Sequence, residues 1–214
     1  MLKTTNLAQQ IIEAAKELAE AGMLPATSGN LSMREPGSDS LLITASGRYK
    51  AKLSEADFIE LALDQQDPEI LAQASAETEL HRQLYRFSDQ ITSVFHTHSK
   101  AAVLISKVYP QAVNLTGYEL LKALPGISTH KARISIPVFE NTQNINSLAR
   151  TVDAYMLSNP DTPAYIIKEH GLYAWGSSSQ QVLNIIEALE TIFEIELEYL
   201  KLQGNSYATS QNLF

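Results

Sequence analysis

Cysteine is absent from the 214 residues of this chain. Disulfide bonds, thiolate metal ligands and a cysteine nucleophile are therefore excluded. Any metal ion must be held by nitrogen and oxygen ligands.

Positive charge is scarce, because 16 Lys and Arg residues stand against 24 Asp and Glu residues, and the net charge is -8. A nucleic-acid backbone would be repelled on average, and no dense basic stretch offsets this. We expect no nucleic-acid partner. A phosphorylated metabolite remains compatible with an acidic protein, since backbone N–H groups and a metal can supply local positive potential.

Long apolar runs are also missing, and none approaches the roughly 20 residues that a membrane span needs. The amino terminus, MLKTTNLAQQ, lacks the charged-then-apolar pattern of a signal peptide. We therefore expect a cytoplasmic protein with no membrane partner.

Apolar residues make up 44% of the sequence, which suffices for one core and predicts a single domain over residues 1–214. The polar residues after Gly204 predict a loose tail over about 204–214.

Pro137 favours an edge strand. Several neighbouring predicted strands are joined by turns that are too short for the crossover connection that parallel strands need. We predict an α/β fold, a three-layer α/β/α sandwich with a mixed, largely antiparallel central sheet. Periodicity and apolar runs predict helices over 5–21, 77–87, 144–157 and 180–202, and strands over 41–44, 91–95, 134–139, 164–168 and 172–175.

The strongest local pattern is the pair His96 and His98 at the end of a predicted strand. Imidazoles two residues apart on an extended segment point to the same side and can reach one ion at about 2.0–2.1 Å. His170, before Gly171, is a third candidate. Taken singly, the pair fits two polar residues at a strand end, and His170 fits a structural role. Together they favour zinc or another divalent ion with an open coordination position, which suits enediolate chemistry.

Three segments of small residues, 27–30, 44–47 and 74–76, have the character of anion-binding loops. In such loops main-chain N–H groups can converge on an anion while hydroxyl and amide side chains add donors. Each segment alone is typical of an ordinary turn or helix cap. Only their combination with a metal site favours a functional role.

These motifs occur in one order: Thr27-Ser-Gly-Asn-Leu-Ser32, Ser75-Ala-Glu77, His96-Thr-His98 and Glu169-His-Gly171. In this order they resemble the class II aldolase/adducin family, over about residues 7–200. Within the family, segments 96–103, 118–122, 136–141 and 169–176 are similar to the dehydratase branch of methionine salvage, which acts on 5-methylthioribulose 1-phosphate.

The resemblance implies a zinc-dependent lyase that works as a homotetramer on a small phosphosugar. It implies His96, His98 and His170 as zinc ligands and Glu119 as the catalytic acid or base. The implied substrate-binding residues are Ser28, Gly29, Asn30, Ser46, Gly47 and Ser75.

Glu77 has three open interpretations: a base, a fourth metal ligand, or a carboxylate that suits the first turn of a helix. Aldolases keep a carboxylate at this position, whereas some dehydratases do not. Ala76 replaces the second phosphate-loop serine of the aldolases, which removes one hydroxyl donor. His81, one turn after Glu77, is interpreted first as a surface or packing residue, with a position near the pocket as the alternative.

Two other functions compete with dehydration. One is a sugar-phosphate aldolase or epimerase of the same family, which shares the enediolate chemistry and is slightly favoured by Glu77. The other is a non-catalytic, adducin-like scaffold, which would not need an intact metal site.

Overall fold

The computed structural model describes the backbone of residues 2–211 and the side chains of residues 6–204. Its strands are β1 (Asn30–Met33), β2 (Ser40–Thr44), β3 (Phe58–Ala62), β4 (Ser93–Thr97), β5 (Ala112–Leu115), β6 (Ile134–Phe139), β7 (Ala164–Ile167) and β8 (Gly171–Gly176). Its helices are α1 (Leu2–Glu20), α2 (Pro68–Leu71), α3 (Thr78–Phe87), α4 (Lys100–Val108), α5 (Ile145–Ser158) and α6 (Ser179–Gln211), with short 3-10 helices η1 (Lys50–Lys52), η2 (Glu55–Asp57) and η3 (Glu119–Ala123).

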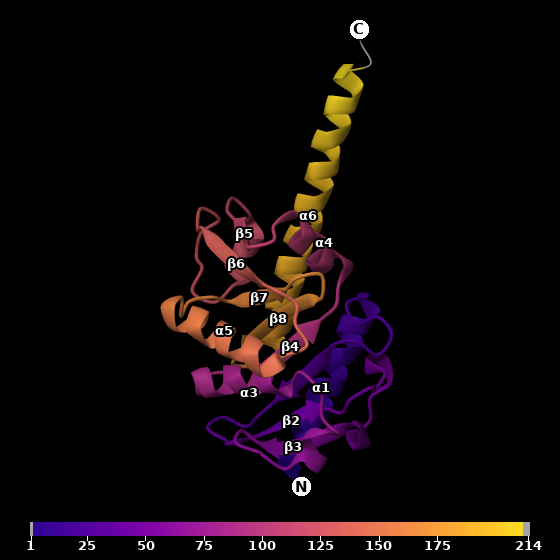
Figure 1. Ribbon diagram of the computed structural model, residues 1–214, viewed down its shortest axis with the longest axis vertical. Helices are drawn as coiled ribbons and strands as arrows, with labels where there is room; N and C mark the ends of the chain where they lie inside the picture. The colour runs from indigo at the N-terminus through magenta and orange to yellow at the C-terminus, as the bar shows by residue number, and fades with distance from the viewer. Residues whose placement is uncertain (1, 212–214) are drawn as a thin grey trace.

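The strands form one eight-stranded sheet in the order β3-β2-β1-β4-β8-β7-β6-β5 (Figure 1). Its neighbouring strands are antiparallel except β6 and β7, which are parallel. The predicted mixed, largely antiparallel sheet is therefore confirmed.

Two separate apolar cores lie on the two faces of the sheet. Side chains alternate between them, because successive residues of a strand point to opposite faces. Along β4, Phe95 packs with α1, α4 and α6, whereas Val94 packs with α3 and α5. Along β8, Leu172 belongs to the first core and Tyr173 to the second. These two helical layers around one sheet confirm the three-layer sandwich.

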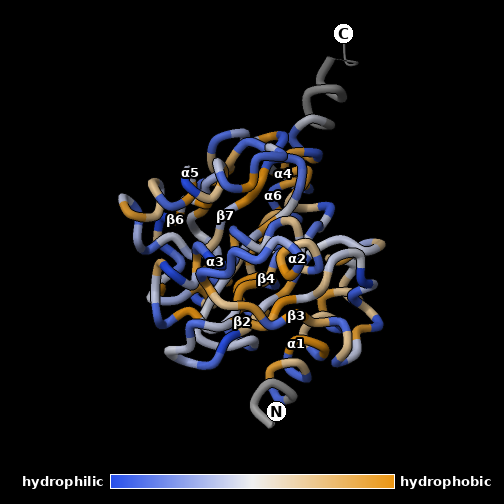
Figure 2. The backbone as a smooth tube through the Cα atoms, turned by 60° about the horizontal axis from the view of Figure 1, so that its bottom comes forward, coloured by the Kyte–Doolittle hydropathy of each residue, from blue (hydrophilic) through white to orange (hydrophobic). Residues whose placement is uncertain are grey.

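Helix α3 is buried although its sequence is largely polar, and Figure 2 shows it mainly in blue. Burial of polar groups is costly unless they are hydrogen-bonded. The guanidinium of Arg82 meets this need by donating to the carbonyl of Leu63 and by pairing with Glu79 at 3.0 Å. The buried His81 bonds to groups near the histidine cluster, so this polar helix links the fold to the site.

The predicted edge position of Pro137 is wrong, because β6 lies between β5 and β7. The neighbouring Val138 directs its N–H to the carbonyl of Gln111, on the β5 side. Since consecutive N–H groups of a strand alternate in direction, the nitrogen of Pro137 faces the β7 side. Pairing with β7 begins only at Val138, so the missing N–H of proline breaks no ladder bond.

Helix α6 is longer than predicted and projects from the rest of the molecule (Figure 1). It continues to Gln211 and so includes residues 204–211 of the predicted loose tail, while residues 212–214 lie outside the described residues. Gly204 does not end it, because one glycine costs a helix only about 1 kcal/mol. Among the described residues, no helix combines the length and apolar character needed to cross a membrane.

The close contact of β8 with β4 requires glycine at position 171. A Cβ there would overlap the carbonyl oxygen of Thr97 and lie 3.0 Å from the ring of His96. We expect Gly171→Ala to lower the free energy of unfolding by about 1–3 kcal/mol, as overpacking does. Gly204→Ala is the matched control, since no atom lies near its added Cβ, and it should leave stability equal or higher. Urea unfolding curves measure both, and equal curves for the two variants would contradict the contact.

Candidate metal centre and substrate cavity

Strand pairing brings the three histidines together. His96 lies in β4 and His98 follows directly after it. Leu172 of β8 pairs with Thr97 of β4, so His170, two residues before Leu172, lies beside the end of β4. The turn between β7 and β8 contains Glu169 at a φ of 56°, a left-handed conformation that reverses the chain tightly.

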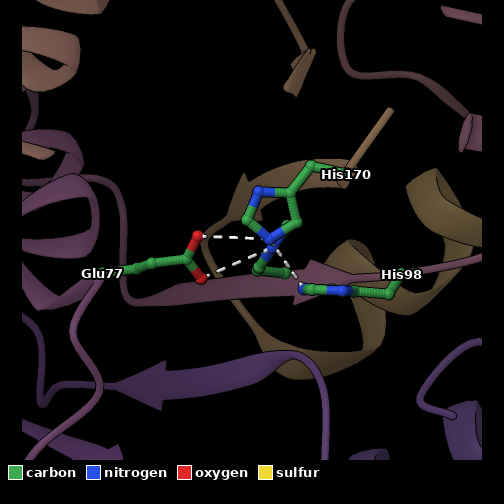
Figure 3. Close-up of side chains that lie close together, drawn as sticks. Glu77, His98 and His170 are labelled. Carbon is green, nitrogen blue, oxygen red and sulfur yellow. Dashed lines mark hydrogen bonds and ion pairs between the residues drawn. The ribbon is translucent and has the colours of Figure 1, made fainter. Parts of the chain in front are cut away.

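The imidazoles and one carboxylate point at a common centre. The Nε2 atoms of His98 and His170 are 3.1 Å apart. The carboxylate oxygens of Glu77 lie 3.5 Å from His96 Nε2 and 3.4 Å from His170 Nε2. Figure 3 shows Glu77, His98 and His170 turned toward one another. The four ligand atoms all lie within 4.8 Å of each other, so this group could bind a metal ion.

The spacing and chemistry of these four groups fit a tetrahedral divalent ion. Ligands bound at 2.0–2.1 Å in a tetrahedron lie about 3.3 Å apart, close to the three distances above. His96 donates from Nδ1 to the carbonyl of Leu172 at 3.0 Å, while its buried Nε2 has no hydrogen-bond partner. Its lone pair is thus free to bind metal. Burial lowers the pKa of His96 and also lowers that of His98, to about 3, which keeps both rings neutral as ligands.

The ring of His96 is also fixed by stacking. It lies parallel to the ring of Tyr173 with centroids 4.0 Å apart, and Tyr173 stacks in turn on Tyr165 at 4.8 Å. Because the ring is held by this stack and by the hydrogen bond to the Leu172 carbonyl, its Nε2 points in one fixed direction. The ligand is therefore oriented before any ion binds.

Glu77 directs its carboxylate away from its own helix. It occupies the N-cap position of α3, yet its side chain makes no capping hydrogen bond. The amide of Asn30 donates to its Oε2 at 2.6 Å. The orientation toward the histidines supports the base and metal-ligand interpretations over that of a simple first-turn carboxylate.

A cavity of about 320 Å³ opens beside this cluster. Its wall includes Glu77, His98 and His170 together with segments from four other parts of the chain, within 27–30, 44–50, 75–76 and 141–145. All six residues that the sequence predicts to bind substrate line it: Ser28, Gly29, Asn30, Ser46, Gly47 and Ser75. The structure thus brings the predicted residues to one place, while their roles remain predictions.

Comparison with known proteins agrees with this arrangement. The family model described as "Class II Aldolase and Adducin N-terminal domain" matches residues 9–197. The chain belongs to the class II aldolase and adducin family. The site of this class II aldolase-type protein therefore lies on a fold that it shares with other members.

Relatives named methylthioribulose-1-phosphate dehydratase match the chain over most of its length. The relative from Marinobacter nauticus is 42% identical over 198 residues, covering 92% of this chain and 95% of the relative. The relative from Sorangium cellulosum is 45% identical over 199 residues, covering 90% and 92%. Among solved structures, L-fuculose-1-phosphate aldolase from Thermus thermophilus is similar, with a TM-score of 0.76, 25% identity and coverage of 94% and 98%.

Glu119 is not brought to the cavity of its own chain. It begins η3, where its side chain is 69% exposed. It pairs with Lys122 at 2.6 Å and with His130 at 3.1 Å. Its contact with Lys122, aided by His130, holds the pKa of this carboxyl below its usual value. Within one copy of this class II aldolase-type chain, Glu77 is the carboxylate at the centre.

His81 is a residue whose place in the site the sequence does not reveal. It is fully buried, and its Nε2 donates to Oδ1 of Asn30. Its Nδ1 accepts from Ser32 Oγ at 2.7 Å, and Ser32 contacts the Tyr85 hydroxyl at 2.8 Å. This chain of bonds fixes the amide of Asn30, whose N–H holds Glu77. The spacing of four residues from Glu77 puts both on one side of α3 and is visible in the sequence. The contact with Asn30 is not, because the two residues are 51 positions apart and meet only in the folded chain.

The buried, neutral state of His81 predicts acid sensitivity. Burial lowers its pKa to about 3, against about 6.5 in the unfolded chain. Between these values the unfolded chain binds a proton that the folded chain does not, so stability falls as pH falls. We expect His81 to contribute about 1.4 kcal/mol per pH unit to this loss. Urea unfolding of chelator-treated protein at several pH values measures the slope, which should be shallower in His81→Asn. An equal slope in wild type and variant would contradict the assignment.

Proposed function

We propose that this protein is a zinc-dependent hydro-lyase that converts 5-methylthioribulose 1-phosphate to 2,3-diketo-5-methylthiopentyl 1-phosphate and water, in methionine salvage. The observation that carries the proposal is the three-histidine cluster that opens into a cavity walled by small polar loops. Relatives named for this reaction support the choice of substrate.

His96, His98 and His170 are the proposed holders of the zinc ion. When bound, zinc supplies Lewis-acid stabilisation of negative charge that develops on the substrate carbonyl and its neighbouring oxygen. Glu77 would either complete the set of ligands or act as a base beside the ion. The hydrogen bond from Asn30 keeps its carboxylate at the cluster in both cases.

The reaction needs proton transfers at two neighbouring carbons. A proton leaves carbon 3, beside the ketone, and the hydroxyl on carbon 4 departs with a proton as water. The resulting enol at carbons 3 and 4 then takes a proton on carbon 4, loses the proton of its carbon 3 hydroxyl and becomes the second ketone. Carboxylates within reach of these carbons can carry the protons.

We assign these transfers to Glu77 and Glu119. Glu77 already faces the cavity. Glu119 has to come from a neighbouring copy, since it does not line the cavity of its own chain. The proposed homotetramer would provide such a copy.

A direct assay tests the function. Purified protein should release water from 5-methylthioribulose 1-phosphate, with the diketone detected by its absorbance. Chelator treatment should abolish turnover and zinc should restore it, since the ligands are preformed. L-fuculose 1-phosphate is the parallel substrate, because an aldolase for it is a structural neighbour. Aldol cleavage without dehydration, or dehydration unaffected by complete metal removal, would overturn the proposal.

Mixed oligomers test the origin of Glu119. Glu119→Gln and His98→Ala should each be inactive alone. Co-expressed in equal amounts, they should recover about a quarter of wild-type turnover, because one site in four would combine an intact histidine cluster with an intact Glu119. The matched control pairs His98→Ala with His170→Ala, which damage the same cluster and should recover nothing. Absence of recovery in the first mixture, with oligomers shown to form, would refute donation across subunits.

A further inference from the structure

Lys50 is a buried cation in the wall of the cavity. It begins η1, and only 2% of the residue is exposed. Its Nζ donates to the carbonyl of Thr27 and to that of Arg48, both at 2.8 Å. Thr27 precedes the loop containing Ser28 and Gly29, and Arg48 follows the turn containing Ser46 and Gly47. One ammonium group thus ties together the two loops that the sequence predicts to bind an anion.

This charge has no partner of opposite sign in the part of the chain that the structure describes. The ion pairs found there do not include Lys50, whereas Lys107, Lys122 and Lys168 each pair with a glutamate. Two carbonyl dipoles offset only part of the cost of burying an ammonium ion. Burial lowers the pKa of Lys50 to about 8, so the group is still mostly protonated near neutral pH.

The ammonium also has hydrogen-bonding capacity to spare. Lysine carries three N–H donors, and two are taken by the carbonyls. The third donor and the uncompensated charge belong to a residue that lines the same cavity as Ser46, Ser75 and His170. An anion in this cavity would complete both the hydrogen bonding and the charge balance of the site.

We propose that Lys50 binds the phosphate group of the substrate and is the counter-charge around which the two small-residue loops are arranged. The identity of the ligand as a phosphosugar rests on the proposed function. The binding of a phosphate group by Lys50 does not. Phosphate carries up to two negative charges, and a lysine binds it as a point charge through charge-assisted hydrogen bonds. The side chain has two tasks here: it holds the loops by their carbonyls and presents its remaining donor to the ligand.

Inorganic phosphate is the probe that tests the inference, with binding measured by isothermal titration calorimetry on the zinc-loaded protein. Lys50→Met should weaken phosphate binding on the order of 10- to 100-fold, as loss of a charged hydrogen bond does. Lys50→Arg, which keeps the charge, should bind within a few-fold of wild type. Lys52→Met, on the exposed end of the same short helix, is the matched control and should bind as wild type does.

A purely structural role for Lys50 predicts other results. It would allow Lys50→Met to bind phosphate normally once circular dichroism shows that the variant is folded, and this outcome would overturn the inference. If Lys50→Met does not fold, nuclear magnetic resonance of isotope-labelled lysine in the wild-type protein replaces it. Saturating phosphate should raise the pKa of Lys50 above the value measured in the phosphate-free protein, and an unchanged value would likewise overturn the inference.

Activity separates this inference from the proposed function. For the phosphorylated substrate, Lys50→Met should raise KM at least about tenfold, in line with the lost charged contact. A wild-type protein that binds phosphate through Lys50 but does not dehydrate the sugar would refute the function alone. An active wild-type protein whose phosphate binding is indifferent to Lys50→Met would refute the inference alone.

Discussion

The pairing of β4 with β8 is the interaction on which the site depends. Its register places His96 opposite Tyr173, so that the ring stacks on the tyrosine and its Nδ1 donates to the carbonyl of the preceding residue, Leu172. The same register carries His170 to the end of β4. Gly171 permits the approach, because any side chain there would overlap the backbone of β4. Backbone geometry, more than any one ligand, determines where a metal can bind.

The opposite wall of the cluster is organised by hydrogen bonds among buried polar side chains. Glu77 is held by Asn30, and Asn30 by His81, which is anchored in turn by Ser32. Such a network is stabilising only when every member has a partner, because each buried unpaired group costs about 1–3 kcal/mol. Both atoms of the Asn30 amide therefore serve this network. Of the two N–H donors of this amide, one bonds to Glu77, so the side chain has only one N–H left to offer to a phosphate.

Local patterns predicted the histidine cluster and the loops because both depend on short segments with distinctive chemistry. The same patterns wrongly assigned Pro137 to an edge strand. Whether its missing N–H breaks a ladder bond depends on which strands pair with β6, and those strands are distant in the sequence. They did not reveal His81 or Lys50, whose significance arises from burial beside distant groups. Strands β1, β3 and β5 were not predicted, because each has only four or five residues and becomes a strand by pairing with partners elsewhere in the sheet. The exposure of Glu119 likewise follows only from tertiary structure.

The separation of the ligands along the chain also affects when an ion can be retained. His98 and His170 are 72 positions apart, whereas His96 and His98 are near neighbours. A chain emerging from the ribosome therefore displays a two-imidazole fragment long before the third ring has been synthesised. Tight retention of an ion has to await closure of the sheet, which couples metal capture to a late stage of biosynthesis. A truncated product ending before His170 would leave the cell with a weak, exposed chelating pair in place of an enclosed site.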